Sequence, residues 1–177
     1  MKLLSDDLKG KRESAKMGQE SAPPDSFLDE YWRSPADDAS NHVIARLGSG
    51  DSGGMILLNR YPYANGHLLV ALGDGRARLL DYTPEQRVAL WSIVDRAVGL
   101  VEATLNPQGV NIGVNQGQAA GAGVPTHLHV HVIPRWIGDV NFIDTVGKIR
   151  VIPSALDEMA ARFREVWSAI ENSTANS

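Results

Sequence analysis

Three of the five histidines alternate with apolar residues in one short stretch. His127, His129 and His131 recur at every second position. Successive side chains of a β-strand point to opposite faces, so this spacing places the three imidazoles on one face. An imidazole, whose unperturbed pKa is about 6.5, can act near neutral pH as a nucleophile, an acid or base, or a metal ligand. The apolar residues between them are expected to face the core: Leu128, Val130 and Val132.

The histidine row, taken alone, has three interpretations. It is a solvated strand face, a metal site in which two or three imidazoles bind zinc, or a site for phosphate chemistry. Catalytic zinc sites usually recruit a further ligand, and the motif contains no Asp or Glu, which weakens the metal interpretation. The chain has no cysteine, which excludes disulfides, thiolate catalysis and zinc sites built on sulfur.

The stretch just before the row favours phosphate chemistry. Amide side chains donate hydrogen bonds to anionic oxygens, and glycines let backbone N–H groups approach such oxygens closely. Both kinds of residue gather here, and we expect them to hold phosphate oxygens: Asn115, Gln116, Gly117, Gln118, Gly121 and Gly123.

A fourth histidine, His67, follows Gly66 at the start of another predicted strand. A lone histidine at a strand start is most often structural. If this strand lies next to the histidine row, His67 would instead meet the row and could orient it. The apolar neighbours Leu57 and Ile56 could flank a bound base.

Hydrophobic periodicity predicts an α+β fold, with a mainly antiparallel sheet of about five strands. The first three strands, joined by Gly- and Asn-rich turns, indicate an antiparallel meander. The five stretches with strand-like length and pattern are 42–47, 55–59, 67–72, 109–116 and 127–134.

Two helices are predicted to cover this sheet. The long one starts with a capping box from Thr83 to Gln86, has Pro84 at its first position, and ends at Asn106. Its predicted buried stripe is Val88, Trp91, Val94, Val98, Val101 and Leu105. The C-terminal helix has a second stripe: Leu156, Met159, Phe163, Val166, Trp167 and Ile170.

The composition is that of an ordinary globular domain. The 177 residues are 43% hydrophobic and 21% charged, with a net charge of −4, which argues against binding to a nucleic-acid duplex. No apolar stretch approaches the roughly 20 residues of a membrane-spanning helix, and the first residues lack a signal-peptide core. We therefore expect a cytoplasmic protein with no membrane partner.

The chain divides into three parts. Residues 1–26 mix basic and acidic side chains with few apolar ones, which predicts a mobile arm. The domain is expected over 27–172 and opens with a short aromatic anchor at 27–32. A polar tail is expected over 173–177.

Two separated motifs resemble those of the histidine triad (HIT) family. The stretch from His127 to Pro134 resembles the family's His-φ-His-φ-His-φ-φ, where φ is apolar, and Pro134-Arg135-Trp136 is similar to its usual continuation. The segment from Asn59 to His67 resembles the upstream Asn-x-x-Pro-x-x-x-Gly-His. The resemblance covers about residues 40–170 and implies the HIT-like fold.

The resemblance also implies a mechanism. His129 would attack the α-phosphorus of a nucleotide and form a covalent nucleotidyl-histidine. His131 would contact the leaving oxygen, and His127 and His67 would support the nucleophile. Asn59 resembles the family position that contacts the ribose. The family implies a homodimer and requires no cofactor or protein-bound metal, although Mg²⁺ can arrive on the phosphates of the substrate.

The ending of the motif is similar to that of the dinucleoside polyphosphate hydrolases and phosphorylases. This implies cleavage of a substrate like diadenosine tetraphosphate, with water or phosphate as the acceptor. Two features depart from relatives: 121–126 replaces the Gly-Gln-Ser/Thr of the fragile-histidine branch, and the zinc-binding N-terminal cysteines of many members are absent. His131 stands where the transferase branch has Gln. The alternatives are a nucleoside phosphoramidase or mononucleotide-conjugate hydrolase, and a nucleotide-binding module with weak catalysis.

Overall fold

A five-stranded antiparallel sheet organises residues 26–139 and 155–175, the part of the chain that the computed structural model describes. In sequence the strands are β1 (Val43–Leu47), β2 (Gly54–Leu58), β3 (Leu68–Leu72), β4 (Gly109–Val114) and β5 (Val130–Arg135). In space their order is β1-β2-β3-β5-β4, so β1 to β3 form the predicted meander and β5 lies between β3 and β4. The α+β class and the five strands are confirmed.

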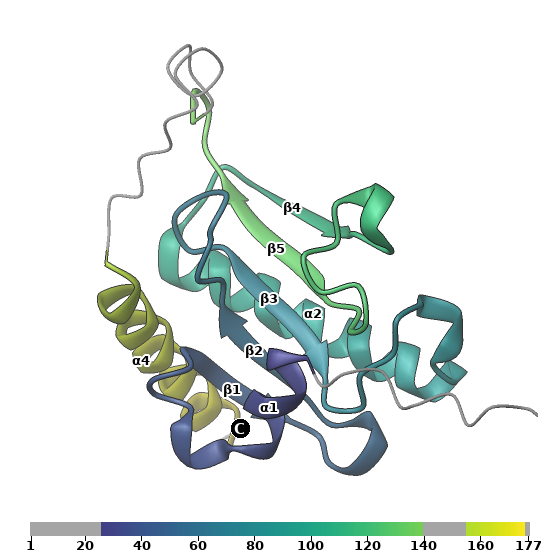
Figure 1. Cartoon of the computed structure of the whole chain (residues 1–177). Coiled ribbons are helices and arrows are strands. Elements are labelled where there is room, and N and C mark those ends of the chain that lie inside the picture. Colours follow the sequence, from purple (N-terminus) through teal and green to yellow (C-terminus); the bar gives the residue numbers. More distant parts are fainter. Residues whose placement is uncertain (1–25, 140–154, 176–177) are drawn as a thin grey trace, which may run out of the picture.

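One face of the sheet is covered by two long helices. Helix α2 (Pro84–Leu105) crosses behind the sheet and α4 (Leu156–Ala175) lies beside β1 (Figure 1). Thr83 and Gln86 form the predicted capping box at the start of α2. The predicted stripe of α4 is confirmed: Met159 and Phe163 are buried, and its other members pack against the core.

The predicted stripe of α2 is partly wrong. Val88 and Trp91 are 68% and 43% exposed, because the helix turns a neighbouring stripe towards the sheet. Apolar residues at three- and four-residue spacing surround much of this helix, so its period alone admits two overlapping faces. The side chains buried against the sheet are Leu90, Ile93, Val94, Ala97, Leu100 and Val101.

A short helix covers the opposite face. Helix α1 (Phe27–Arg33) lies in front of the sheet in Figure 1 and confirms the predicted aromatic anchor. Its Leu28 is fully buried in a second hydrophobic cluster, which the sheet completes with Val43, Met55, Leu57, Leu69 and Ala71. Successive side chains of the strands point to opposite faces, and helices pack against the apolar side chains on both faces.

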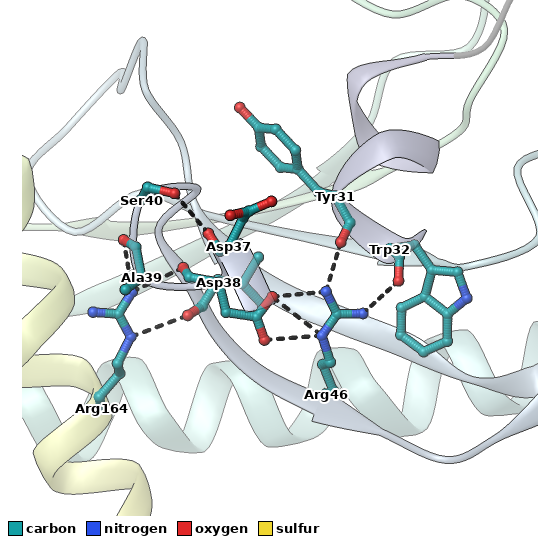
Figure 2. Close-up of polar contacts among 9 residues, drawn as sticks. Tyr31, Trp32, Asp37, Asp38, Ala39, Ser40, Arg46 and Arg164 are labelled. Atoms are coloured by element: carbon teal, nitrogen blue, oxygen red, sulfur yellow. Dashed lines mark hydrogen bonds and ion pairs between the residues drawn. The ribbon is translucent and has the colours of Figure 1, made fainter. Parts of the chain in front are cut away.

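Arg46 fastens α1 to this face. Its guanidinium pairs with Asp38 at 2.7 Å and donates to the carbonyl oxygens of Tyr31 at 2.6 Å and Trp32 at 2.8 Å (Figure 2). A cation is favourable at these carbonyls because they lie at the negative end of the helix. Arg164 of α4 donates to the carbonyls of Asp38 and Ala39 in the same loop, which ties both helices to β1 (Figure 2).

Two predicted boundaries differ from the structure by three residues. The strand expected over 127–134 begins at Val130, because the backbone N–H of Leu128 bonds to the carbonyl of Arg76 at 2.7 Å before the ladder with β3 starts. Helix α4 continues to Ala175, so 173–175 of the predicted tail are helical. The predicted arm lies outside the described residues except for Ser26, which caps α1.

No helix in the described ranges has the length and apolar character needed to cross a membrane.

Candidate active site

All three histidines of the row lie on the face that α1 covers. His131 pairs with Leu69 across β5 and β3, and Leu69 belongs to the cluster under α1. His127, His129 and His131 are 0%, 5% and 8% exposed. The intervening side chains lie in the core under α2, which confirms the predicted alternation: Leu128, Val130 and Val132.

A pocket of about 460 Å³ opens in front of the row. His129 and His131 line it directly. The rest of its wall is largely aromatic or apolar and comes from α1, the end of β2 and the segment after it, β3 and the loop before β5. It comprises Phe27, Tyr31, Leu57, Leu58, Asn59, Arg60, Tyr61, Tyr63, Leu69, Gly121, Gly123 and Val124.

The hydrogen bonds of His129 fix its tautomer. Its Nδ1 lies 2.9 Å from the carbonyl oxygen of His127, and because a carbonyl only accepts, Nδ1 carries the proton. The lone pair of the neutral ring is then on Nε2. Burial lowers the pKa of His129 below 6.5; its bond to the carbonyl opposes this, and the nearby His127 adds to the lowering. His129 is therefore a neutral, oriented imidazole at neutral pH.

His131 has the opposite tautomer. The backbone N–H of Tyr63 donates to Nδ1 of His67 at 3.1 Å, so the proton of His67 is on Nε2. That Nε2 lies 2.9 Å from Nδ1 of His131, which must accept. The proton of neutral His131 is consequently on its own Nε2. Burial and the neighbouring His129 lower the pKa of His131 to about 4.

His67 therefore contacts the row, as expected if its strand were adjacent. Its fully buried ring also lies 3.2 Å from the amide nitrogen of Asn59, whose oxygen accepts from the N–H of Tyr61. Tyr63 stacks on the ring of His131 at 5.8 Å between centroids. Asn59 thus both lines the pocket and holds His67.

His127 does not line the pocket. Its Nε2 donates to the carbonyl of Leu72 at 2.8 Å, and its Nδ1 lies 2.9 Å from Ser26 Oγ and 3.2 Å from Asp29 Oδ1. Ser26 donates its own hydroxyl hydrogen to Asp29 Oδ2 at 2.7 Å, so towards His127 it accepts. Both nitrogens of His127 therefore face groups that accept hydrogen bonds, and the Nδ1 side of the ring lies beside a carboxylate.

The predicted nucleotide-binding residues fall into two groups. Asn59, Gly121 and Gly123 line the pocket. The others do not: Asn115 donates to the carbonyl of Gly121 at 3.4 Å, and Gln116 accepts from the N–H of Leu79 at 2.9 Å. Gly117 and Gln118 sit at and within the short 3₁₀ turn Gln118–Ala120, also away from the pocket lining.

The sequence interpretation missed the contribution of α1. Phe27 and Tyr31 wall the pocket, and Ser26 and Asp29 reach His127. The Ser-x-x-Asp spacing before an aromatic run is a helix-capping signature that could have indicated this helix and its start. Ile56 was expected to flank a base, but it is buried in the core on the other face, and only its neighbour Leu57 reaches the pocket.

Within residues 26–139 and 155–175, no three side chains among His, Asp and Glu gather so as to hold a metal ion. What the pocket does bring together is a neutral imidazole with a free ring nitrogen and a second imidazole with a ring N–H.

Comparison with known proteins links the site to one family. The model of the HIT domain matches residues 50–136, which span β2 to β5 and include all four histidines of the site. Two proteins of the dinucleoside polyphosphate branch are among the relatives of this chain. They are the AP-4-A phosphorylase of Mycobacterium tuberculosis and the asymmetrical bis(5'-nucleosyl)-tetraphosphatase of Schizosaccharomyces pombe.

The two relatives are similar to this chain over different lengths. The M. tuberculosis protein is 38% identical over 112 residues, which cover 63% of this chain and 57% of the relative. The S. pombe protein is 36% identical over 89 residues, covering 50% and 48%. The chain thus spans about half the length of these curated relatives.

Solved structures agree on the fold. A zinc-bound histidine triad family protein from Mycobacterium smegmatis has a TM-score of 0.62 at 25% identity, covering 81% of this chain and 96% of that one. A histidine triad nucleotide-binding protein from Sulfolobus tokodaii has a TM-score of 0.62 at 21% identity, covering 80% and 93%.

Proposed function

We propose that this protein cleaves dinucleoside polyphosphates at an α-phosphate through a nucleotidyl-histidine on His129. The observation that carries the proposal is the pair of opposite tautomers at one pocket. His129 has its lone pair on Nε2, and His131 has its proton on Nε2. A nucleophile and a hydrogen-bond donor of this kind are what displacement at phosphorus needs.

In the first step Nε2 of His129 attacks the α-phosphorus, an N–P bond forms, and the bond from phosphorus to the bridging oxygen breaks. The electron pair leaves with the polyphosphate, whose oxygen receives a hydrogen bond from Nε2–H of His131. The His129 ring becomes cationic, and the carbonyl of His127 at Nδ1 stabilises that charge. In the second step an acceptor oxygen attacks phosphorus, and the N–P electron pair returns to His129.

The pocket walls suit the nucleoside. Phe27 and Tyr31 lie with ring centroids 5.1 Å apart, and Tyr63 is half exposed beside His131. Such rings can stack on a base, and Arg60 at the rim adds a positive charge for the phosphates. Asn59 is the ribose ligand in this proposal, and the backbone N–H of Gly123, which lines the pocket, is a phosphate ligand. The N–H of Gly121 donates to the carbonyl of Gln118 at 2.9 Å and would have to be released to join it. Asn115, Gln116, Gly117 and Gln118 would need to rearrange to take that role.

The acceptor is inorganic phosphate in this proposal, because a relative with 38% identity is named AP-4-A phosphorylase. The S. pombe relative, a tetraphosphatase, supports water as the alternative acceptor. No protein-bound cofactor is required, and Mg²⁺ enters only on the substrate phosphates. A cytoplasmic location fits a nucleotide substrate.

We further propose that the protein is a homodimer. Strand β4 is the edge of the described sheet, and its Ile112 is 46% exposed. Trp91 of α2 is 43% exposed. Apolar side chains on an open sheet edge favour pairing with a second chain. Light scattering during gel filtration would test this, and a monomer at micromolar concentration would contradict it.

The activity test is incubation with diadenosine tetraphosphate, with and without phosphate, followed by mass-resolved chromatography. Phosphorolysis gives ADP and ATP only when phosphate is present. Hydrolysis gives AMP and ATP without it. An added mass of one adenylyl group on the peptide containing His129, after acid-free quenching, would support the covalent step. No product from this substrate would turn the test to nucleoside phosphoramidates, and tight nucleotide binding without any turnover would favour a binding module.

A further inference from the structure

Two of the three hydrogen-bonding or ionic partners of His127 lie outside the region that matches the HIT domain. Both ring nitrogens of His127 have partners, and the ring is fully buried. One partner is the carbonyl of Leu72 at the end of β3. The other two, Ser26 and Asp29, belong to the first turn of α1, which precedes residues 50–136.

In the hydrogen-bond network around His127, every donor meets an acceptor. Asp29 Oδ2 accepts from the backbone N–H of Ser26 at 2.9 Å and from its hydroxyl at 2.7 Å. Ser26 Oγ accepts from the N–H of Asp29 at 3.2 Å and from His127 Nδ1 at 2.9 Å. Each polar atom therefore has a partner of the right kind, which holds the His127 ring rigidly.

His127 passes this constraint to the nucleophile. The carbonyl oxygen of His127 is what accepts from Nδ1 of His129, at 2.9 Å. Because the side chain and carbonyl of one residue share a Cα, fixing the His127 ring from three sides also fixes the oxygen that orients His129. Displacement chemistry is sensitive to such placement, since an error of about 1 Å can cost about 100-fold in rate.

We propose that Ser26 and Asp29 are positioning residues for the nucleophile, acting through His127. This inference rests on the proposed function of His129. In this proposal the α1 region contributes to the site in two ways. Phe27 and Tyr31 line the pocket, whereas Ser26 and Asp29 set the geometry of His129.

The space around the contact is closed by a third element. A Cβ at Gly75, in the loop after β3, would lie 2.5 Å from His127 Nδ1 and 2.7 Å from Asp29 Oδ1. A methyl group there must separate the carboxylate from the ring. Gly75→Ala therefore disrupts the same contact without changing α1 or its cap.

The test compares Asp29→Asn, Ser26→Ala and Gly75→Ala with the wild-type chain. Single-turnover measurements with diadenosine tetraphosphate give the rate of His129 adenylylation, and equilibrium titration with AMP gives nucleotide affinity. We expect each variant to lose about 10-fold or more in the adenylylation rate and less than about twofold in affinity. Ser26→Thr, which keeps the hydroxyl, should recover most of the rate.

A matched control lies on the same helix turn. Glu30 is an exposed acid next to Asp29, and Glu30→Gln should change neither quantity. If α1 serves only as a wall, loss of its cap would weaken nucleotide affinity and leave the rate of adenylylation unchanged. That pattern, or unchanged values in all three variants, would overturn the proposal.

A second readout does not depend on turnover. In ¹H–¹⁵N spectra of the histidine rings, wild-type His127 should show protons on both nitrogens, and the Nδ1 proton should be lost or exchange faster in Asp29→Asn. Identical ring spectra would overturn the proposal. If the wild-type chain forms no adenylyl-histidine, the proposed function fails, and the ring spectra alone decide whether α1 positions His127 and His129.

Discussion

His129 and His131 are two residues apart on one face, yet the partners at their Nδ1 atoms differ in kind. His129 meets a carbonyl, which can only accept, whereas His131 meets the Nε2–H of His67, which donates. The two neutral rings therefore carry their protons on opposite nitrogens.

The difference originates in the backbone. The carbonyl of His127 sets the proton of His129 directly. The N–H of Tyr63 sets that of His131 through the ring of His67, as a relay of two hydrogen bonds. Identical side chains in an alternating motif thus carry their protons on opposite nitrogens because of two backbone groups, one of which acts through the His67 ring.

The largest expected effect comes from removing the lone pair. His129→Ala should lower turnover of diadenosine tetraphosphate by about 10⁴-fold or more, because no other ring in the row has an unprotonated nitrogen at the pocket. Nucleotide affinity should stay within a few-fold, since the aromatic walls are untouched. Single-turnover kinetics and AMP titration measure the two quantities. Turnover near the wild-type level would remove His129 as the nucleophile.

Removing the donor should have a smaller and more selective effect. His131→Ala should slow cleavage of diadenosine tetraphosphate by about 100-fold, within the usual range for loss of a proton or hydrogen-bond donor. The p-nitrophenyl ester of AMP, whose leaving group needs less stabilisation, should lose markedly less. Equal losses on both substrates would contradict the donor role and make the two histidines alike in function.

The alternation of the motif was sufficient to predict which face the histidines share and which residues lie beneath them. It could not predict the tautomers, because that of His129 depends on a backbone carbonyl and that of His131 depends on Tyr63 and His67, which lie far away in sequence. The buried face of α2 was partly missed for a different reason: one helical period fits two neighbouring stripes, and only contact with the sheet selects between them.

Loops and termini were harder to interpret than strands. Gln116 was assigned to phosphate from its residue type, whereas its side chain holds the N–H of Leu79. Ser26 was placed in the arm, whereas it caps α1 and contacts His127. A polar side chain in a loop has many local backbone partners, so its type alone does not identify its ligand.

The hydrogen bonds that set the tautomer of His131 can also be broken at His67. His67→Ala removes the Nε2–H donor, which leaves Nδ1 of His131 without a donor and lets its proton move to that atom. We expect about a 10-fold loss of turnover, smaller than for His131→Ala because the ring itself remains. His67→Gln, whose amide can donate to the same atom, should retain more activity. An unchanged rate in His67→Ala would make His67 a structural residue only.

The smallest effect is the response to pH, and it tests both rings together. Protonation of His129 abolishes its lone pair, so turnover falls as the pH drops through its pKa. Burial lowers the pKa of His129 below 6.5, so more than half of the His129 rings are neutral at pH 6.5, and burial lowers the pKa of His131 to about 4, so that ring is neutral there. Turnover should therefore change less than about twofold between pH 7.5 and 6.5, and fall only at lower pH. An acid limb centred at or above 6.5 in the kcat/KM profile would mean that burial does not keep the nucleophile neutral, and the tautomer that distinguishes His129 from His131 would not persist in solution.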